Sequence, residues 1–145
     1  MQELEIEGKL MKRPLTRWIA ECGNMEVIRF ILNKTGVGDC PVMVLCFDNW
    51  SSDFLKNITT NEHLKIAGHL RGFAFHDVDN TLHYMNYVVA TSIIAEDGQS
   101  AVVDDLESNI EMEESCLRIM KEKDYLPVPQ DEYEIIIESV GDNIW

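Results

Sequence analysis

Aromatic side chains lie near lysine and arginine at several points along this 145-residue chain, a combination suited to holding a single nucleic-acid strand. Unpaired bases expose π-faces, so aromatic rings can stack on them without regard to sequence, while nearby cations bind the phosphates. In the run LRGFAF, simple alternation places Phe73 and Phe75 on the same strand face as Arg71. The residues that we expect to contact a single strand are Lys12, Arg13, Arg17, Trp18, Lys34, Phe47, Trp50, Phe54, Lys56, Arg71, Phe73, Phe75 and Tyr84.

The other reactive residues do not fall into patterns typical of a catalytic or metal site. The four histidines lack the short spacing of metal ligands, and no two of the four cysteines form a CxxC pair. No glycine-rich phosphate loop, GxSxG elbow or metal-carboxylate motif occurs. We therefore expect no catalytic residue, no metal and no cofactor, and we interpret the cysteines as reduced thiols. Paired acids are expected on the solvated face of an acidic helix, namely Asp104 with Asp105 and Glu113 with Glu114.

Five segments have the alternation or the β-branched composition of strands, and a barrel built from them would position the aromatic and basic residues. One or two helical turns are expected at 54–58, between the third and fourth strands, and residues 15–24 form a loop or the start of an uneven hairpin. Gly8 indicates a bend or a close approach of two backbones. Phe30 and Tyr87 are expected in the core, because a small barrel needs large interior residues. The strands cover residues 4–10, 25–32, 42–47, 64–75 and 82–94. 

The order of these elements predicts a mainly β fold, a five-stranded Greek-key OB barrel over residues 1–97. Residues 98–145 form an acidic extension. The formal net charge is −14, of which residues 1–95 contribute −2 (9 Lys and Arg against 11 Asp and Glu) and residues 96–145 contribute −12 (3 against 15). Any nucleic-acid contact must therefore be local to the first two thirds of the chain.

Within the acidic extension, apolar residues recur at helical spacing. They predict an amphipathic helix over 101–123, with its apolar stripe on the barrel or on a neighbouring subunit and its acidic face outward. The sequence YEIIIES at 133–139 predicts a short strand that covers a sheet edge. Three roles stay open for this extension: it repels DNA from one side, it competes with DNA for the cations, or it recruits a partner protein.

Five segments occur in a characteristic order along the chain: LEIEGKLMKRP, VIRFIL, VMVLCFDN, HLKIAGHLRGFAF and HYMNYVVATSI. As an ordered set they resemble the bacterial single-stranded DNA-binding proteins, with primosomal replication protein N as a near relative. The resemblance covers residues 3–95 and implies a homo-oligomer, a dimer or a tetramer, that coats single-stranded DNA in replication, recombination or the processing of phage or mobile-element DNA. It also implies base stacking at Phe47 and Phe75. The end GDNIW is loosely similar to the family's acidic-hydrophobic tail, which implies that Ile144 and Trp145 bind a replication or recombination protein.

Two functions remain open at this stage. The first is a single-stranded DNA-binding module, and the second is an OB-fold protein-interaction module whose acidic C-terminal segment binds a partner protein. No window of 18 consecutive apolar residues occurs, so no membrane span and no membrane partner are expected. The acidic, alternating N-terminus does not have the composition of a secretory signal, which favours a cytoplasmic protein.

Overall fold

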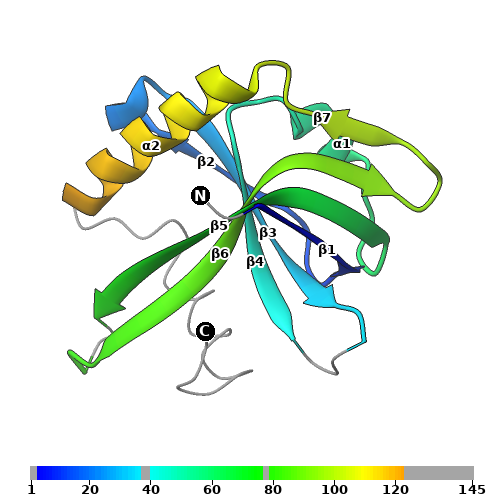
Figure 1. Cartoon of the computed structure of the whole chain (residues 1–145), viewed down its shortest axis with the longest axis horizontal. Coiled ribbons are helices and arrows are strands. Elements are labelled where there is room, and N and C mark those ends of the chain that lie inside the picture. The colour runs from blue at the N-terminus through cyan, green and yellow to red at the C-terminus, as the bar shows by residue number, and fades with distance from the viewer. Residues whose placement is uncertain (1–2, 37–39, 77–78, 123–145) are drawn as a thin grey trace.

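A computed structural model describes residues 3–36, 40–76 and 79–122, and its strands form one continuous sheet (Figure 1). The predicted strand at 133–139 and the C-terminal Ile144 and Trp145 lie outside the described residues. The strands are β1 (Glu3–Leu10), β2 (Leu15–Ile19), β3 (Met25–Lys34), β4 (Pro41–Phe47), β5 (His63–His76), β6 (Leu82–Ala95) and β7 (Ser100–Val102). The helices are the short 3-10 helix η1 (Ala20–Cys22), α1 (Ser52–Lys56) and α2 (Leu106–Glu122).

Five of the strands close a barrel. Neighbours pair in the order β1, β5, β6, β4 and β3, and β1 then pairs with β3. All of these pairs are antiparallel except β4 with β6, which run parallel. Helix α1 joins the third barrel strand, β4, to the fourth, β5. The predicted OB barrel, with a short helix at this point of the chain, is confirmed.

The barrel core is built from alternate residues of the strands. On β3 and β4 these residues are Ile28, Phe30 and Leu32, followed by Val42, Val44 and Cys46. Full burial of an aliphatic or phenyl side chain contributes about 1.5–3 kcal/mol, so this cluster dominates the stability of the fold. Phe30 is in the core, as predicted.

The outer face of the barrel is also buried over β3, β4 and β6. Leu45 and Val89 alternate with core residues along their strands, yet both are fully buried. Tyr87 was expected to be interior and is buried, but it belongs to this outer set. Helix α2 lies against β4, and Asn109 of α2 donates a hydrogen bond of 2.9 Å to the Phe47 carbonyl oxygen at the end of that strand. The α2 helix is therefore a second layer on the outside of the barrel (Figure 1).

Two glycines let neighbouring strands approach closely. A Cβ atom at Gly8 would lie 2.2 Å from the backbone oxygen of Asn33, and one at Gly68 would lie 2.1 Å from that of Val89. The close approach predicted at Gly8 is thus present. At Gly68 the register between β5 and β6 shifts, because Thr91 of β6 is an extra residue in the ladder.

Three local features differ from the sequence-based prediction. Residues 15–19 form a full strand, β2, paired with β3. Helix α2 begins at Leu106 rather than near residue 101, because Asp105 caps it: its carboxylate accepts a hydrogen bond of 3.1 Å from the Ser108 amide. The preceding Ser100–Val102 forms β7, which a turn containing Gly98 (φ 90°) joins to β6. A glycine turn followed by β-branched Val102 was the available signal for this hairpin.

No helix in the described part of the chain has the length and apolar character needed to cross a membrane.

Candidate nucleic-acid interface

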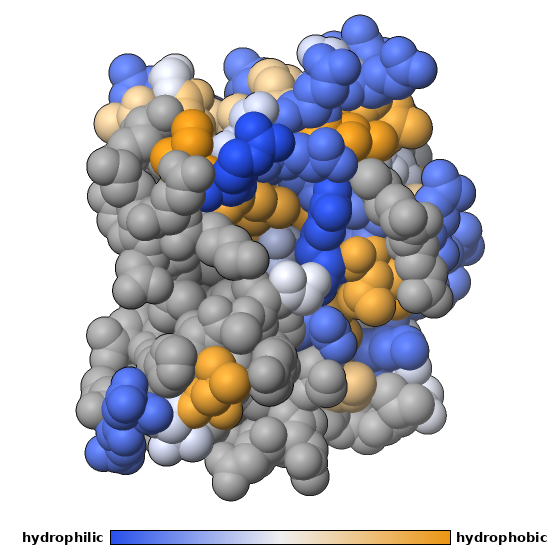
Figure 2. All heavy atoms as spheres, turned by 60° about the vertical axis from the view of Figure 1, so that its left-hand side comes forward, coloured by the Kyte–Doolittle hydropathy of each residue, from blue (hydrophilic) through white to orange (hydrophobic). Residues whose placement is uncertain are grey.

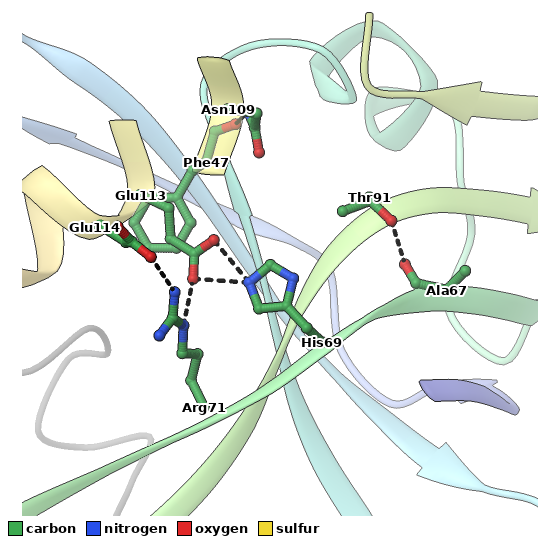
Figure 3. A network of polar contacts seen from close by, with 8 residues as sticks. All are labelled: Phe47, Ala67, His69, Arg71, Thr91, Asn109, Glu113 and Glu114. Carbon is green, nitrogen blue, oxygen red and sulfur yellow. Dashed lines mark hydrogen bonds and ion pairs between the residues drawn. The ribbon is translucent and has the colours of Figure 1, made fainter. Parts of the chain in front are cut away.

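His69 and Arg71 of β5 meet two glutamates of α2 on the outer face of the barrel (Figure 3). His69 Nε2 lies 2.7 Å from Glu113 Oε2. Arg71 Nε donates a hydrogen bond of 2.8 Å to Glu113 Oε1, and Arg71 Nη2 donates one of 3.3 Å to Glu114 Oε1. His69 and Arg71 have the opposite parity to Ile66, a barrel-core residue of the same strand. Arg71 therefore faces outward, as predicted. Carboxylates of the same chain nevertheless hold this cation.

Glu113 is the centre of this cluster. Its side chain has no exposed surface, and His69 is also buried. A buried carboxylate is tolerated only where charged or hydrogen-bonding partners compensate its lost hydration, and His69 and Arg71 provide them. Burial alone would lower the pKa of Arg71, but the hydrogen bond and negative charge of Glu113 outweigh it, so the pKa is raised. The guanidinium is therefore firmly charged.

The position of Glu113 corrects the expectation that both paired acids of the helix are solvated. Over residues 106–119, where burial in α2 is described, Asn109, Glu113 and Cys116 are buried, and they recur at intervals of four and three. That spacing places them on one stripe of the helix, which faces the barrel. Glu114, one position further around the helix, is exposed, as are Asp104 and Asp105.

Phe47 is a second correction. We expected its ring to stack on bases, but the residue is 0% exposed. Helix α2 contacts this residue, because Asn109 donates a hydrogen bond to the Phe47 carbonyl oxygen. A base cannot reach a ring face there while the helix is in place, so Phe47 is not part of the open surface. Trp50 and Phe54, from the connection after β4, are half-buried and pack against the barrel core.

Three of the predicted contact residues are exposed on the connection between β1 and β2 and on β2 itself. Lys12 and Arg13 are exposed in this connection, and Trp18 of β2 is 63% exposed. Within the described residues β2 pairs with β3 alone and so forms an edge of the sheet. We refer to Lys12, Arg13 and Trp18 as the β1–β2 surface.

Two further predicted cations are exposed at other places. Lys34 lies at the end of β3, opposite Gly8 in the β1–β3 ladder. Lys56, at the end of α1, forms an ion pair of 3.8 Å with Asp53. Neither position adjoins the β1–β2 surface in the strand register, so the structure does not gather all predicted phosphate contacts in one place.

The remaining predicted aromatics belong to an arm formed by the ends of β5 and β6, which projects from the barrel (Figure 1). In this arm Phe73 is paired with Met85, Phe75 with His83, and Ala74 with Tyr84. The register irregularity in the ladder falls at Ala67 and Gly68, before the arm begins. The side chains of Arg17, Phe73, Phe75 and Tyr84 lie outside the described part of the structure.

A cleft of about 440 Å³ lies where the first turns of α2 pass β1 and β5. Leu106 and Ile110 line it from the helix, and Glu3 and Glu5 line it from β1. Two carboxylates repel a phosphate, so we do not assign nucleic-acid binding to this cleft. On the side of the molecule that carries α2 and β2, apolar residues appear as separate patches between hydrophilic ones (Figure 2).

The fold has clear counterparts among solved structures. No protein-family model and no curated protein sequence matches the chain. The mitochondrial single-stranded DNA binding protein Rim1 from S. cerevisiae matches with a TM-score of 0.55 and 11% sequence identity, over 66% of this chain and 94% of that one. The SSB domain of a Synechococcus sp. protein matches with a TM-score of 0.51 and 11% identity, over 64% and 93%. The chain has the OB fold of SSB domains. About a third of this SSB-like chain has no counterpart in either structure.

Proposed function

We propose that this SSB-like chain binds single-stranded DNA through base stacking and phosphate contacts, without a chemical step. The observation that carries the proposal is the exposed indole of Trp18, close in sequence to Lys12 and Arg13 on an OB barrel. An indole accepts any base, and the two cations bind the adjoining phosphates. OB folds hold about 4–16 nucleotides, so one strand can extend from this surface onto the barrel.

Helix α2 competes with DNA for the rest of the outer face in this proposal. The carboxylates of Glu113 and Glu114 lie against Arg71, where phosphates of a bound strand would otherwise lie. While α2 is in place, DNA contacts the β1–β2 surface. When α2 moves away, Arg71 and the ring of Phe47 become available to the same strand. Of the roles left open for the acidic extension, competition for cations is the one that these contacts favour.

Replacing Trp18 with alanine should weaken binding of a dye-labelled oligo-dT by about 5–150-fold, because one stacked base contributes about 1–3 kcal/mol. Fluorescence anisotropy measures this without relying on tryptophan emission. Trp18→Phe should retain most of the affinity, since a phenyl ring still stacks. Val102→Ala is a matched control, because Val102 is a 59% exposed residue of the other edge strand, β7. Equal affinity of Trp18→Ala and the parent protein would refute the assignment of this surface.

The affinity should also fall only slowly with salt. Of the predicted phosphate contacts, Lys12, Arg13 and Lys34 are exposed and form no ion pair among the described contacts. Each neutralised phosphate of a single strand contributes about −0.7 to the slope of log K against log salt, so a slope of roughly −2 follows. A titration with KCl measures it. A slope near zero would contradict phosphate binding.

A second candidate function rests on the outer side of α2. Asp105, Glu107 and Glu111 are exposed there, and together with Asp104 and Glu114 they form an acidic strip. Such a strip suits a basic partner protein, with the barrel acting as its scaffold. A protein that binds neither oligo-dT nor duplex DNA, but retains its fold, would favour this function over the first.

A further inference from the structure

Two thiols that are far apart in the sequence meet where α2 lies beside η1. Cys22 Sγ is 2.9 Å from Cys116 Sγ, across a sequence separation of 94 residues, and neither cysteine forms a disulfide. We propose that Cys22 and Cys116 form a redox pair whose oxidation to an intrachain disulfide fastens α2 to the barrel. The pair lies where α2 meets η1, the short helix that directly follows β2.

The geometry requires little movement. A disulfide has an S–S distance of about 2.05 Å, so the sulfur atoms must approach by about 0.9 Å from the present 2.9 Å. Cys22 is half-buried and accessible to a small oxidant, whereas Cys116 is fully buried and cannot meet a thiol of another molecule while α2 is in place.

The two sulfur atoms have different chemical roles. Burial, and then the hydrogen bond and charge of Cys22, raise the pKa of the Cys116 thiol. Because the thiolate is the nucleophile, Cys22 is the sulfur that reacts first with an oxidant. Cys116 then acts as the resolving thiol, which needs only to lose its proton when the adjacent sulfur has become electrophilic.

Hydrogen peroxide serves as the oxidant in this scheme. The Cys22 thiolate attacks one peroxide oxygen, the O–O bond breaks, and the departing hydroxide takes a proton to become water, leaving a sulfenic acid. Cys116 then loses its proton and attacks the Cys22 sulfur. The S–O bond breaks and the hydroxide takes that proton to form a second water. Two thiols are oxidised to one disulfide, and one peroxide is reduced to two waters.

The other two cysteines do not compete for this role. Cys46 points into the barrel core, on the opposite side of β4 from α2, and burial raises its pKa to about 12 although Ser51 opposes the shift. Cys40 packs against the same core. Their side chains are therefore separated from Cys116 by the sheet itself.

The disulfide would keep α2 packed over the outer face of the barrel. Cys116 lies three residues after Glu113, so a bond there holds the glutamate on His69 and Arg71. In the reduced protein α2 is held by non-covalent contacts and can open. The consequence for DNA rests on the proposed function: the oxidised protein binds a single strand more weakly, because Arg71 and Phe47 stay covered.

Peptide mapping of the full-length chain under non-reducing conditions, after treatment with dilute hydrogen peroxide, tests the pair directly. We expect a linked peptide containing Cys22 and Cys116, which disappears in Cys22→Ser and in Cys116→Ser but persists in the matched control Cys40→Ser. Hydrogen exchange of α2 amides should slow by about tenfold or more on oxidation, and dithiothreitol should restore the original rate. A linkage between other cysteines, or oxidation of Cys22 without the linkage, would overturn the proposal. Unchanged α2 exchange in the linked protein would overturn the fastening of the helix.

A labelled oligo-dT titration of the same two forms separates this inference from the proposed function. A lower affinity of the oxidised form supports control of the outer face by the disulfide. Equal affinity of the two forms refutes that control. If neither form binds DNA, the proposed function fails, while peptide mapping and hydrogen exchange still decide whether the thiol pair fastens α2.

Discussion

Replacing Glu113 with glutamine should lower the free energy of unfolding by about 3 kcal/mol. The substitution keeps the shape of the side chain but removes its negative charge. Glu113 is the fully buried one of the two carboxylates that contact Arg71. Removing one partner of a buried ion pair costs about 3–5 kcal/mol. We expect the lower end of that range, because the Arg71 side chain keeps 27% of its surface exposed and can be partly hydrated. Urea unfolding followed by circular dichroism measures the change.

Glu114 provides the matched control for this substitution. It carries the same charge on the next position of α2 and contacts the same guanidinium, but its side chain is half exposed. Exposed ion pairs contribute about 0–1 kcal/mol, so Glu114→Gln should leave stability almost unchanged. Similar losses for the two variants would show that burial of Glu113 does not determine the stability of the helix contact.

Much of the barrel could be predicted from sequence because its signals are local. Alternation along residues 4–10 and 64–66 fixes which side chains face inward, and Gly8 lies where two backbones touch. The same alternation placed Leu70 inward, but that side chain is exposed. The short helix after Phe47 follows from turn-forming residues at 48–53. These patterns depend on neighbours within a few positions, so they can be interpreted without knowing how distant parts of the chain pack.

The packing of α2 over the outer face of the barrel could not be predicted in the same way. Glu113 meets His69 and Arg71 across 44 and 42 residues, and an acidic residue on an amphipathic helix is ordinarily assigned to the solvent face. One signal was available: PVMVLCF is apolar without alternation, which is typical of a strand buried on both faces. That run conflicts with base stacking by Phe47, and the structure resolves the conflict in favour of burial.

Gly68→Ala should lower the free energy of unfolding by about 3 kcal/mol or more. The new methyl group would lie 2.1 Å from the Val89 oxygen and 2.9 Å from its carbonyl carbon, and both are backbone atoms that cannot rotate away. Overpacking in a well-packed region costs about 1–3 kcal/mol, and forced separation of two paired strands adds lost ladder hydrogen bonds. The measurement is again urea unfolding.

Gly36→Ala is the matched control for Gly68→Ala. Gly36 has a positive φ of 86°, but an added Cβ there meets no atom within 4 Å. Its substitution should cost only about 1 kcal/mol, from backbone strain alone. Equal losses at the two positions would show that β5 and β6 can separate without penalty.

Gly68→Ala should also weaken the contact of α2 with the barrel, and this effect bears on the proposed function. Gly68 directly precedes His69, so a shift of β5 away from Val89 moves the imidazole relative to Glu113. The contact of 2.7 Å between them tolerates little displacement, since hydrogen bonds weaken steeply with poor geometry. Hydrogen exchange in α2 should therefore accelerate in Gly68→Ala under conditions where the barrel is still folded, and remain unchanged in Gly36→Ala. Unaltered α2 exchange in both variants would mean that the helix stays on the barrel without the His69 contact.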